Sequence, residues 1–260
     1  MICPLPHAVE SRLTEGIFFD VFTNSPVFEK AYGDAVEYIV GRMLNSLPAR
    51  YSVSKPNKEK IGKLEFAGAD WIIEHGVDRA YIECKAKRLA LPGRVAEKIE
   101  DLRHEISHLA EAVLQNYRNI DRAIRRSDAS LGIEGSMFSI VVTLEDWFLF
   151  SPITTKMLDE MITEGLREAG LTTGLRQRAP YLIFGAEAFQ HAIAALVSHS
   201  MPEVLGGLHT PKYEGWLPST YLKKHFADVD PATIGDFEQD FDSVVGTLLS
   251  DVKMRKAGRH

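Results

Sequence analysis

Apolar residues in this chain follow two different spacings, and each spacing predicts a different element. In long segments they recur every three or four positions, as on one face of an amphipathic helix; in short segments they alternate with polar residues, as in a half-buried strand. At 28–46 one apolar stripe is formed by Phe28, Tyr32, Ala35, Ile39 and Met43. The helices expected from this spacing cover residues 28–46, 94–126, 153–169, 185–198 and 236–256.

The strands expected from alternation cover residues 63–67, 69–74, 79–87, 137–145 and 180–184. Two segments, the lysine-rich 51–61 and the Pro- and Gly-containing 209–233, are expected to be loop-rich. The first half of the chain then has the order helix, three strands, helix, strand. Helices that alternate with strands predict an α/β fold with a mixed sheet.

Two units are expected along the chain. Residues 1–150 hold the elements of an α/β core, and residues 151–260 form a mostly helical C-terminal extension, either separate or packed on the core as one domain. A length of 260 residues permits either arrangement.

The composition is typical of a soluble globular protein, with 45% hydrophobic and 25% charged residues. No apolar run approaches the roughly 18 residues of a membrane span, and the first residues lack the pattern of a secretion signal. The two cysteines, Cys3 and Cys84, exclude a disulfide framework and a four-cysteine zinc site. We therefore expect a cytoplasmic protein that does not enter a membrane.

The net charge of −6 argues against a surface that binds polyanions all over, but basic residues form three local groups. Taken singly, each group is explained as a solvated face. Three groups around one site indicate a local surface for nucleic-acid phosphates. The groups are Arg50, Lys55, Lys58, Lys60 and Lys63; Lys85, Lys87, Arg88 and Arg94; and Arg118, Arg122, Arg125 and Arg126.

The expected helix at 94–126 contains the sequence HEISH at 104–108, which has the HExxH spacing of zinc metalloproteases. Two histidines four positions apart reach one ion from one helical face, and the glutamate between them activates the metal-bound water. A third ligand is also required, and Glu134 is the candidate downstream. This motif makes a zinc protease one hypothesis for the chain.

The phase of the helix argues against a zinc site. At 100° per residue, His104 and His108 lie on the polar face, together with Glu111, Gln115 and the arginines. A face rich in arginine repels a divalent cation, so we expect two solvent-exposed histidines. The opposite, apolar stripe comprises Ile99, Leu102, Ile106, Leu109, Val113, Ile120 and Ile124.

The expected strand at 79–87 indicates a different metal site. Its alternation turns one set of side chains toward a core and the other set to the opposite surface. The two sets are Ala80, Ile82, Cys84 and Ala86, and Tyr81, Glu83, Lys85 and Lys87. Asp70 begins the preceding strand, and a tight turn at 75–78 allows a hairpin to bring it close to Glu83.

Two converging carboxylates suit a hard cation such as Mg²⁺ or Mn²⁺. Lys85, on the same strand face as Glu83, can orient or deprotonate a water, or neutralise a developing oxyanion. The alternative is an exposed cross-strand ion pair between Glu83 and a lysine. The spacing of these residues is compatible with a metal site and with an exposed ion pair.

The stretches GAD at 68–70 and ECK at 83–85 resemble the D…ExK signature of the PD-(D/E)xK, or restriction-endonuclease-like, nucleases. The order helix, three strands, helix, strand is similar to the common core of that superfamily. YGDAVEYIVGRML at 32–44 resembles its first helix, which in many members carries a further glutamate, and Glu37 stands at that place. ECKAKRL, followed by AEAVLQNYRNI at 110–120, also resembles bacterial nuclease-like proteins associated with defence or mobile elements.

The resemblance covers about residues 28–145 and departs from the pattern in two places. Ala69 replaces the proline before the aspartate, and Gln115 and Tyr117 do not have the spacing of RecB-type nucleases. The resemblance implies a role for each residue of the motif. Asp70 and Glu83 are metal ligands with the Cys84 carbonyl as a further one, Lys85 is the catalytic lysine, and Glu37 binds the metal directly or through water.

We therefore expect a Mg²⁺- or Mn²⁺-dependent nuclease that hydrolyses phosphodiester bonds, with DNA as the expected substrate, in antiviral defence or DNA processing. A homodimer or a partner protein in a defence complex fits this expectation. The alternatives are a non-catalytic nucleic-acid-binding module on the same fold and the HExxH zinc protease. The residues expected to contact the nucleic-acid backbone are Lys87, Arg88, Arg118, Arg122 and Arg125.

Overall fold

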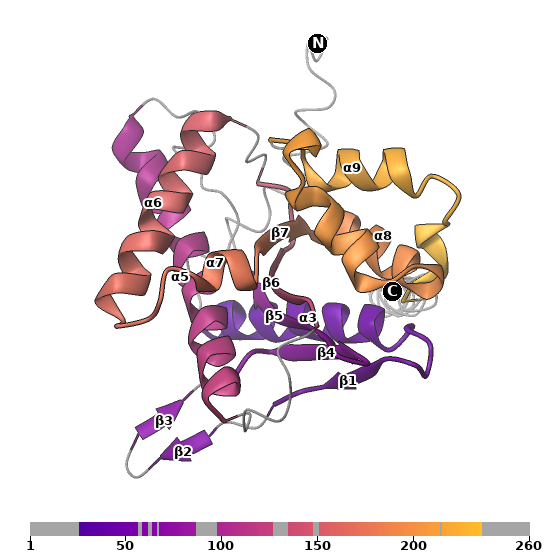
Figure 1. The fold of residues 1–260 in the computed structure, drawn as a ribbon, viewed down its shortest axis with the longest axis horizontal. Coiled ribbons are helices and arrows are strands. Elements are labelled where there is room, and N and C mark those ends of the chain that lie inside the picture. The colour runs from indigo at the N-terminus through magenta and orange to yellow at the C-terminus, as the bar shows by residue number, and fades with distance from the viewer. Residues whose placement is uncertain are drawn as a thin grey trace, which may run out of the picture.

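The computed structural model shows an α/β protein built around one five-stranded mixed sheet, with helices on both faces of the sheet (Figure 1). The strand order is β1-β4-β5-β6-β7. The structure describes residues 26–56, 59–61, 64–66, 68–86, 98–126, 135–147, 151–213 and 215–235.

The sheet is antiparallel on one side and parallel on the other. β4 pairs antiparallel with β1 and with β5, whereas β5, β6 and β7 run parallel to one another. The central parallel strand, β6, is rich in β-branched residues, which suit a strand covered on both faces. The strands are β1 (Ser52–Ser54), β4 (Trp71–His75), β5 (Asp78–Lys85), β6 (Met137–Thr143) and β7 (Tyr181–Gly185).

Each face of the sheet has its own hydrophobic core. On one face, α3, α8 and α9 pack over residues such as Ile82 and Phe184. On the other face, α5 and α6 pack over Tyr81 and Val141. The helices are α3 (Pro26–Leu44), α5 (Ile99–Arg126), α6 (Pro152–Glu168), α7 (Leu175–Arg178), α8 (Ala186–Ser198) and α9 (Pro218–His225).

The three strands expected before the second helix include one misassignment. The expected strand 63–67 is not in the main sheet: β3 (Leu64–Phe66) forms a separate hairpin with β2 (Glu59–Ile61). The third strand of the sheet is β1, inside the segment 51–61 that was expected to be a loop. The prediction was wrong because three-residue strands carry too little alternation to be recognised, and β1 owes its stability to pairing with β4.

In the second half of the chain, α6, β7 and α8 lie where sequence spacing predicts helix, strand and helix. The expected loop at 209–233 instead contains α9 and two short 3₁₀ turns, Pro211–Tyr213 and Pro231–Thr233. Pro218 at the first position of α9 starts that helix. The helix expected at 236–256 lies outside the described residues.

The sheet and the core continue past residue 150, the expected limit of the first unit. β7 pairs with β6 through five residue pairs, from Ser139↔Tyr181 to Thr143↔Gly185. Phe189 of α8 belongs to the same hydrophobic core as Ile73 of β4. Elements of both expected units therefore share one sheet and one core.

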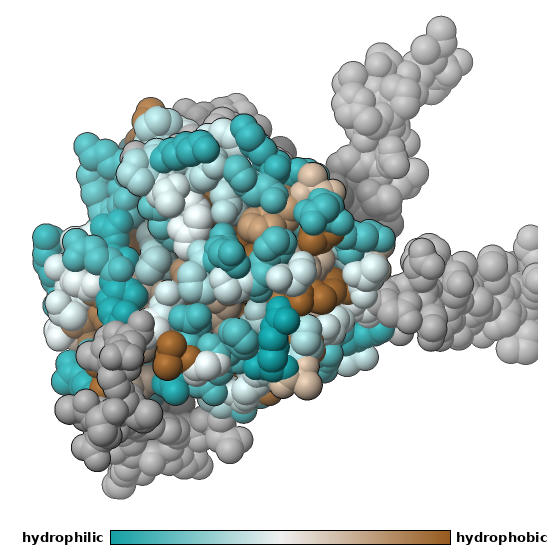
Figure 2. Space-filling view, turned by 45° about the vertical axis from the view of Figure 1, so that its right-hand side comes forward, coloured by the Kyte–Doolittle hydropathy of each residue, from teal (hydrophilic) through white to brown (hydrophobic). Residues whose placement is uncertain are grey.

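Apolar residues reach the surface in Figure 2 only in small patches among hydrophilic ones. The large apolar side chains exposed in the described part of the chain are scattered over several elements: Val27, Tyr38, Val77, Ile99, Ile153 and Val197. No helix in that part is long and apolar enough to cross a membrane. On the face shown in Figure 2, the described part of the chain therefore exposes apolar side chains in small patches rather than in one broad area.

Asn116 of α5 ties that helix to two strands from inside the core. Its side chain is fully buried, and its amide nitrogen donates to Tyr81 O of β5 at 3.2 Å and to Ile140 O of β6 at 3.0 Å. Replacing Asn116 with Leu leaves two buried carbonyls without this donor. We expect Asn116→Leu to lower the free energy of unfolding by about 1–3 kcal/mol, since each of the two lost hydrogen bonds contributes about 0.5–1.5 kcal/mol.

Urea denaturation of the variant measures this loss. The matched control is Asn45→Leu, at an exposed position just after α3, which we expect to stay within about 0.5 kcal/mol of the wild type. An Asn116→Leu protein as stable as the control would show that the two hydrogen bonds do not hold α5 in place.

Candidate functional site

The β4–β5 hairpin places an aspartate opposite a glutamate at one end of the sheet. Its turn has two residues, and the first, Gly76, has a φ of 61°, a conformation that glycine adopts without strain. The turn sets the register in which Trp71 pairs with Ile82. One step further along, Asp70 faces Glu83, as the sequence predicts.

Asp70 is held by the main chain of β5. Its Oδ2 accepts a hydrogen bond from the Cys84 N–H at 2.7 Å. Burial raises the pKa of Asp70, the Cys84 N–H opposes that shift, and the negative charge of Glu37 adds to it. In a strand the N–H and C=O of one residue point to the same side. The Cys84 carbonyl therefore also points to the side on which Asp70 lies.

Glu83 is the most buried acidic residue of the site, with 3% of its surface exposed. Lys85 Nζ lies 2.8 Å from its Oε1, and Gln115 Nε2 of α5 donates to its Oε2 at 2.9 Å. Burial raises the pKa of Glu83 to about 7, although the charge of Lys85 opposes the shift and the charges of Asp70 and Glu37 add to it. The carboxylate is held between two donors but has lost most of its hydration.

The alternation expected for β5 is confirmed, but the expected exposed surface is not. Ala80 and Ile82 pack against one core, while Tyr81 and Glu83 point to the opposite side. That side is covered by α5 rather than open to solvent. The interpretation of Glu83 as half of an exposed ion pair is therefore wrong: its partner Lys85 is 32% exposed, but Glu83 itself is buried.

Glu37 of α3 lies close enough to Asp70 and Glu83 for its negative charge to raise the pKa of both. It forms an ion pair with Lys55, whose Nζ also lies 5.6 Å from the centre of the Trp71 ring. The helix lies close to β4 because position 41 is glycine, where a Cβ atom would overlap the Trp71 ring. Glu37 thus contributes negative charge to the site while Lys55 compensates part of it.

Gln115 is the site residue that sequence analysis assigned to the wrong face. It was expected on the exposed polar face of α5, but it is half-buried and binds Glu83. The reason is that α5 packs against β5 and β6 on one side and α6 on another, so it has more than one buried face. The adjacent amides Gln115 and Asn116, between Leu114 and Tyr117, were the available sequence signal.

The HExxH residues do not gather around one point. His104 is exposed and His108 is half-buried, with their ring centres 5.0 Å apart, whereas Glu105 is buried with 5% exposure. Among the described residues no three His, Cys, Asp or Glu side chains are grouped as metal ligands, and this holds for Glu37, Asp70 and Glu83 too. Glu134, the expected third zinc ligand, lies outside the described residues.

The structure describes three of the five residues that were expected to bind phosphate. Arg118 is exposed on α5 one turn beyond Gln115, and Arg125 is 68% exposed and paired with Asp121. Arg122 is half-buried, and one of its nitrogens donates to Asn119 Oδ1 at 2.5 Å. Lys87 and Arg88 lie outside the described residues.

Comparisons with protein-family models, with curated proteins and with solved structures gave no match for this chain.

The raised pKa of Glu83 has a consequence for stability. In the unfolded chain its pKa is 4.5, and in the folded protein it is about 7. Between these values the folded protein binds more protons than the unfolded chain, so stability decreases as pH rises through this window. We expect the wild type to lose up to about 3 kcal/mol of unfolding free energy between pH 4.5 and 7 from this group.

Glu83→Gln removes the titrating group, so we expect the loss across this window to be smaller in the variant. Denaturant titrations at several pH values, in metal-free buffer, measure the difference between the two proteins. Parallel curves for wild type and variant would show that Glu83 titrates normally.

Proposed function

We propose that the chain is a metal-dependent nuclease of the PD-(D/E)xK type that hydrolyses phosphodiester bonds in DNA. The observation that carries this proposal is the arrangement at the end of β4 and β5. Asp70 bound to the Cys84 N–H faces a buried Glu83 that is paired with Lys85. These are the residues of the D…ExK signature. The order α3, then β1, β4 and β5, then α5 and β6 supports it at the level of the fold.

The donor set fits a hard divalent cation. Asp70 and Glu83 have lost hydration and repel each other, and this unfavourable state is what a bound cation relieves. Asp70, Glu83 and the Cys84 carbonyl would hold Mg²⁺ or Mn²⁺, with Glu37 acting through water. Such an ion lowers the pKa of a bound water and stabilises negative charge on the phosphoryl group.

The side chains that do not bind the metal have separate roles in the proposed mechanism. Lys85 holds Glu83 in place and presents its ammonium group beside the carboxylate, where it can stabilise charge that develops on the phosphate. Gln115 fixes the second oxygen of Glu83, so the carboxylate cannot rotate freely. Arg118 and Arg125, exposed further along α5, supply contacts to the phosphate backbone.

The test is cleavage of a panel of labelled single-stranded and double-stranded DNA and RNA by the purified chain with Mg²⁺, with Mn²⁺ and with a chelator. We expect cleavage of DNA that requires the metal. Binding of nucleic acid without cleavage under all metal conditions would instead favour a non-catalytic binding module.

A further inference from the structure

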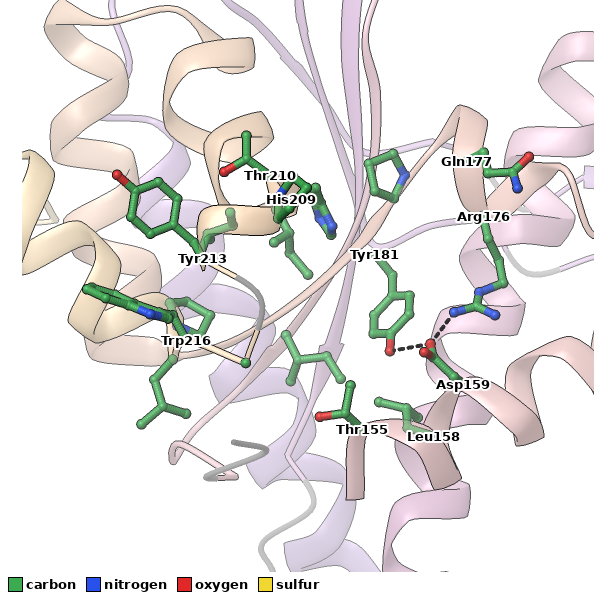
Figure 3. A pocket seen from close by; sticks show the side chains of 18 of the residues that line it. Thr155, Leu158, Asp159, Arg176, Gln177, Tyr181, His209, Thr210, Tyr213 and Trp216 are labelled. Atoms are coloured by element: carbon green, nitrogen blue, oxygen red, sulfur yellow. Dashed lines mark hydrogen bonds and ion pairs between the residues drawn. The ribbon is translucent and has the colours of Figure 1, made fainter. Parts of the chain in front are cut away.

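A large cavity lies beside the candidate catalytic residues and has no role in the proposed mechanism. Its volume is about 700 Å³, and it lies between α6 and α7 on one side and residues 208–218 on the other, with β7 as its floor. Figure 3 shows Tyr181 of β7, Thr155 of α6 and His209 pointing into this space. The volume is in the range of pockets that bind small organic molecules.

The cavity is connected to the catalytic residues through Trp147. This side chain lines the cavity and also a smaller pocket of about 140 Å³ that contains Lys85 and His108. Trp147 comes shortly after β6, which is the strand next to β5. Molecules in the cavity and in the Lys85 pocket would therefore both contact Trp147.

The floor of the cavity is an unpaired sheet edge. Ser139 N–H donates to Pro180 O at 3.1 Å, and in a parallel pair alternate residues bond to the same neighbour. Leu182 and Phe184 therefore bond to β6, while Tyr181 and Ile183 turn their N–H and C=O groups to the open side. Those groups have no hydrogen-bond partner among the residues that the structure describes.

Two further donors in the cavity wall have no partner in the described part of the chain. They are the indole Nε1 of Trp147, a residue with 6% exposure, and the buried Nε of Arg176. The other nitrogens of Arg176 are engaged with Asp159 and with Thr163 Oγ1, and Tyr181 OH donates to Asp159 at 2.9 Å (Figure 3). Both nitrogens have almost no solvent-accessible surface, so a molecule in the cavity reaches them only if these side chains move.

These features limit the chemistry of the ligand. A wholly apolar molecule would leave the open main-chain groups of Tyr181 and Ile183 without partners, and the described residues around the cavity include no group of three metal-ligating side chains. A nucleobase has donors and acceptors along one edge, which match alternating main-chain N–H and C=O groups, and flat apolar faces, which match Leu158 and Ile183. Arg167, 64% exposed and paired with the exposed Glu164, can exchange that partner for an attached phosphate.

We propose that this cavity binds an unpaired nucleobase, supplied by the strand that is cut at the neighbouring site. A base in the middle of a duplex is stacked and paired and cannot enter such a cavity without being extruded. Single-stranded nucleic acid, or a strand with an unpaired end, is then the preferred substrate. The link to cutting rests on the proposed function, whereas binding of the base does not.

The experiment fills the cavity with a side chain. Thr155→Phe places a ring in the space that Thr155 lines, and Ile153→Phe, at a position 63% exposed on the same helical turn, is the control. Both variants and the wild type are titrated with deoxynucleoside monophosphates, a short single strand and a blunt duplex of the same sequence, in chelator to prevent cutting. Melting temperatures confirm that both variants fold.

We expect Thr155→Phe to lose about tenfold in affinity for the single strand and for mononucleotides, since contacts to one base contribute about 1–3 kcal/mol. Ile153→Phe should bind like the wild type, and affinity for the duplex should change little in either variant. Equal binding of all probes by the two variants would overturn the proposal.

Three other outcomes distinguish the source of the base and separate the cavity proposal from the nuclease proposal. Loss of mononucleotide binding without loss of single-strand binding would overturn the strand as the source and assign the cavity to free nucleotides. A wild type that binds bases in the cavity but never cuts with Mg²⁺ or Mn²⁺ would overturn the nuclease function while supporting the cavity. Cutting of single strand and duplex at equal rates by both Phe variants would overturn the cavity while supporting the nuclease.

Discussion

Glu83→Gln and Asp70→Asn should each reduce Mg²⁺-dependent cleavage to the background of uncatalysed controls. Both replacements keep the shape of the side chain but remove a negative charge that a divalent cation needs. In Asp70→Asn the side-chain oxygen can still accept the Cys84 N–H, so the hairpin keeps its register. The loss is therefore expected in catalysis and metal affinity rather than in folding.

The matched control for these two variants is Glu74→Gln. Glu74 is on β4, on the same hairpin, but it is 37% exposed and paired with Arg79 away from the site. We expect it to cleave like the wild type. Single-turnover cleavage rates, with circular dichroism for the fold, make the comparison. If Glu83→Gln and Asp70→Asn cut as fast as Glu74→Gln, the metal site is elsewhere in the chain.

Lys85→Met should slow cleavage by about 10²–10³-fold, the loss seen when one donor to a developing oxyanion is removed. The methionine keeps the length of the side chain, so the variant isolates the charge. Nucleic-acid affinity should fall only slightly because the arginines of α5 remain. The control is Lys156→Met, at a position 79% exposed on α6, which we expect to leave the rate unchanged.

The pH dependence of the Lys85→Met protein provides a second measurement. The charge of Lys85 lowers the pKa of Glu83, so removing it should raise that pKa further. In the variant, Glu83 then ionises at a higher pH than in the wild type. The remaining cleavage should therefore increase over a more alkaline pH range than wild-type cleavage does. A variant with a wild-type rate and pH profile would exclude Lys85 from the mechanism.

The candidate site was predictable where it depends on local geometry. The alternation of β5 put Glu83 and Lys85 on one side, and the turn at Gly76 put Asp70 opposite Glu83. Both relations involve residues within one hairpin, so spacing fixes them almost completely. The ranges of α6, β7 and α8 were predictable for a similar reason, since one face of each is apolar.

Other features depend on how elements pack over one another. Gln115 is 32 residues from Glu83 in sequence, and nothing in the periodicity of α5 showed that the helix is covered on two sides. The burial of Glu83, and with it the raised pKa, exists only because α5 closes over the end of β5. The strand β1 owes its existence to β4 rather than to its own three residues.

The spacing of apolar and charged residues was thus enough to indicate an α/β fold and to place Glu83 and Lys85 on one strand face, because both rest on short-range backbone geometry. The resemblance to the D…ExK signature, rather than spacing, singled out Asp70, Glu83 and Lys85 as a metal site. The packing of the chain decided the partners of those side chains, the addition of β7 to the sheet and the cavity beside Trp147. These features join residues far apart in sequence, and such contacts are set by complementary surfaces that no local pattern encodes.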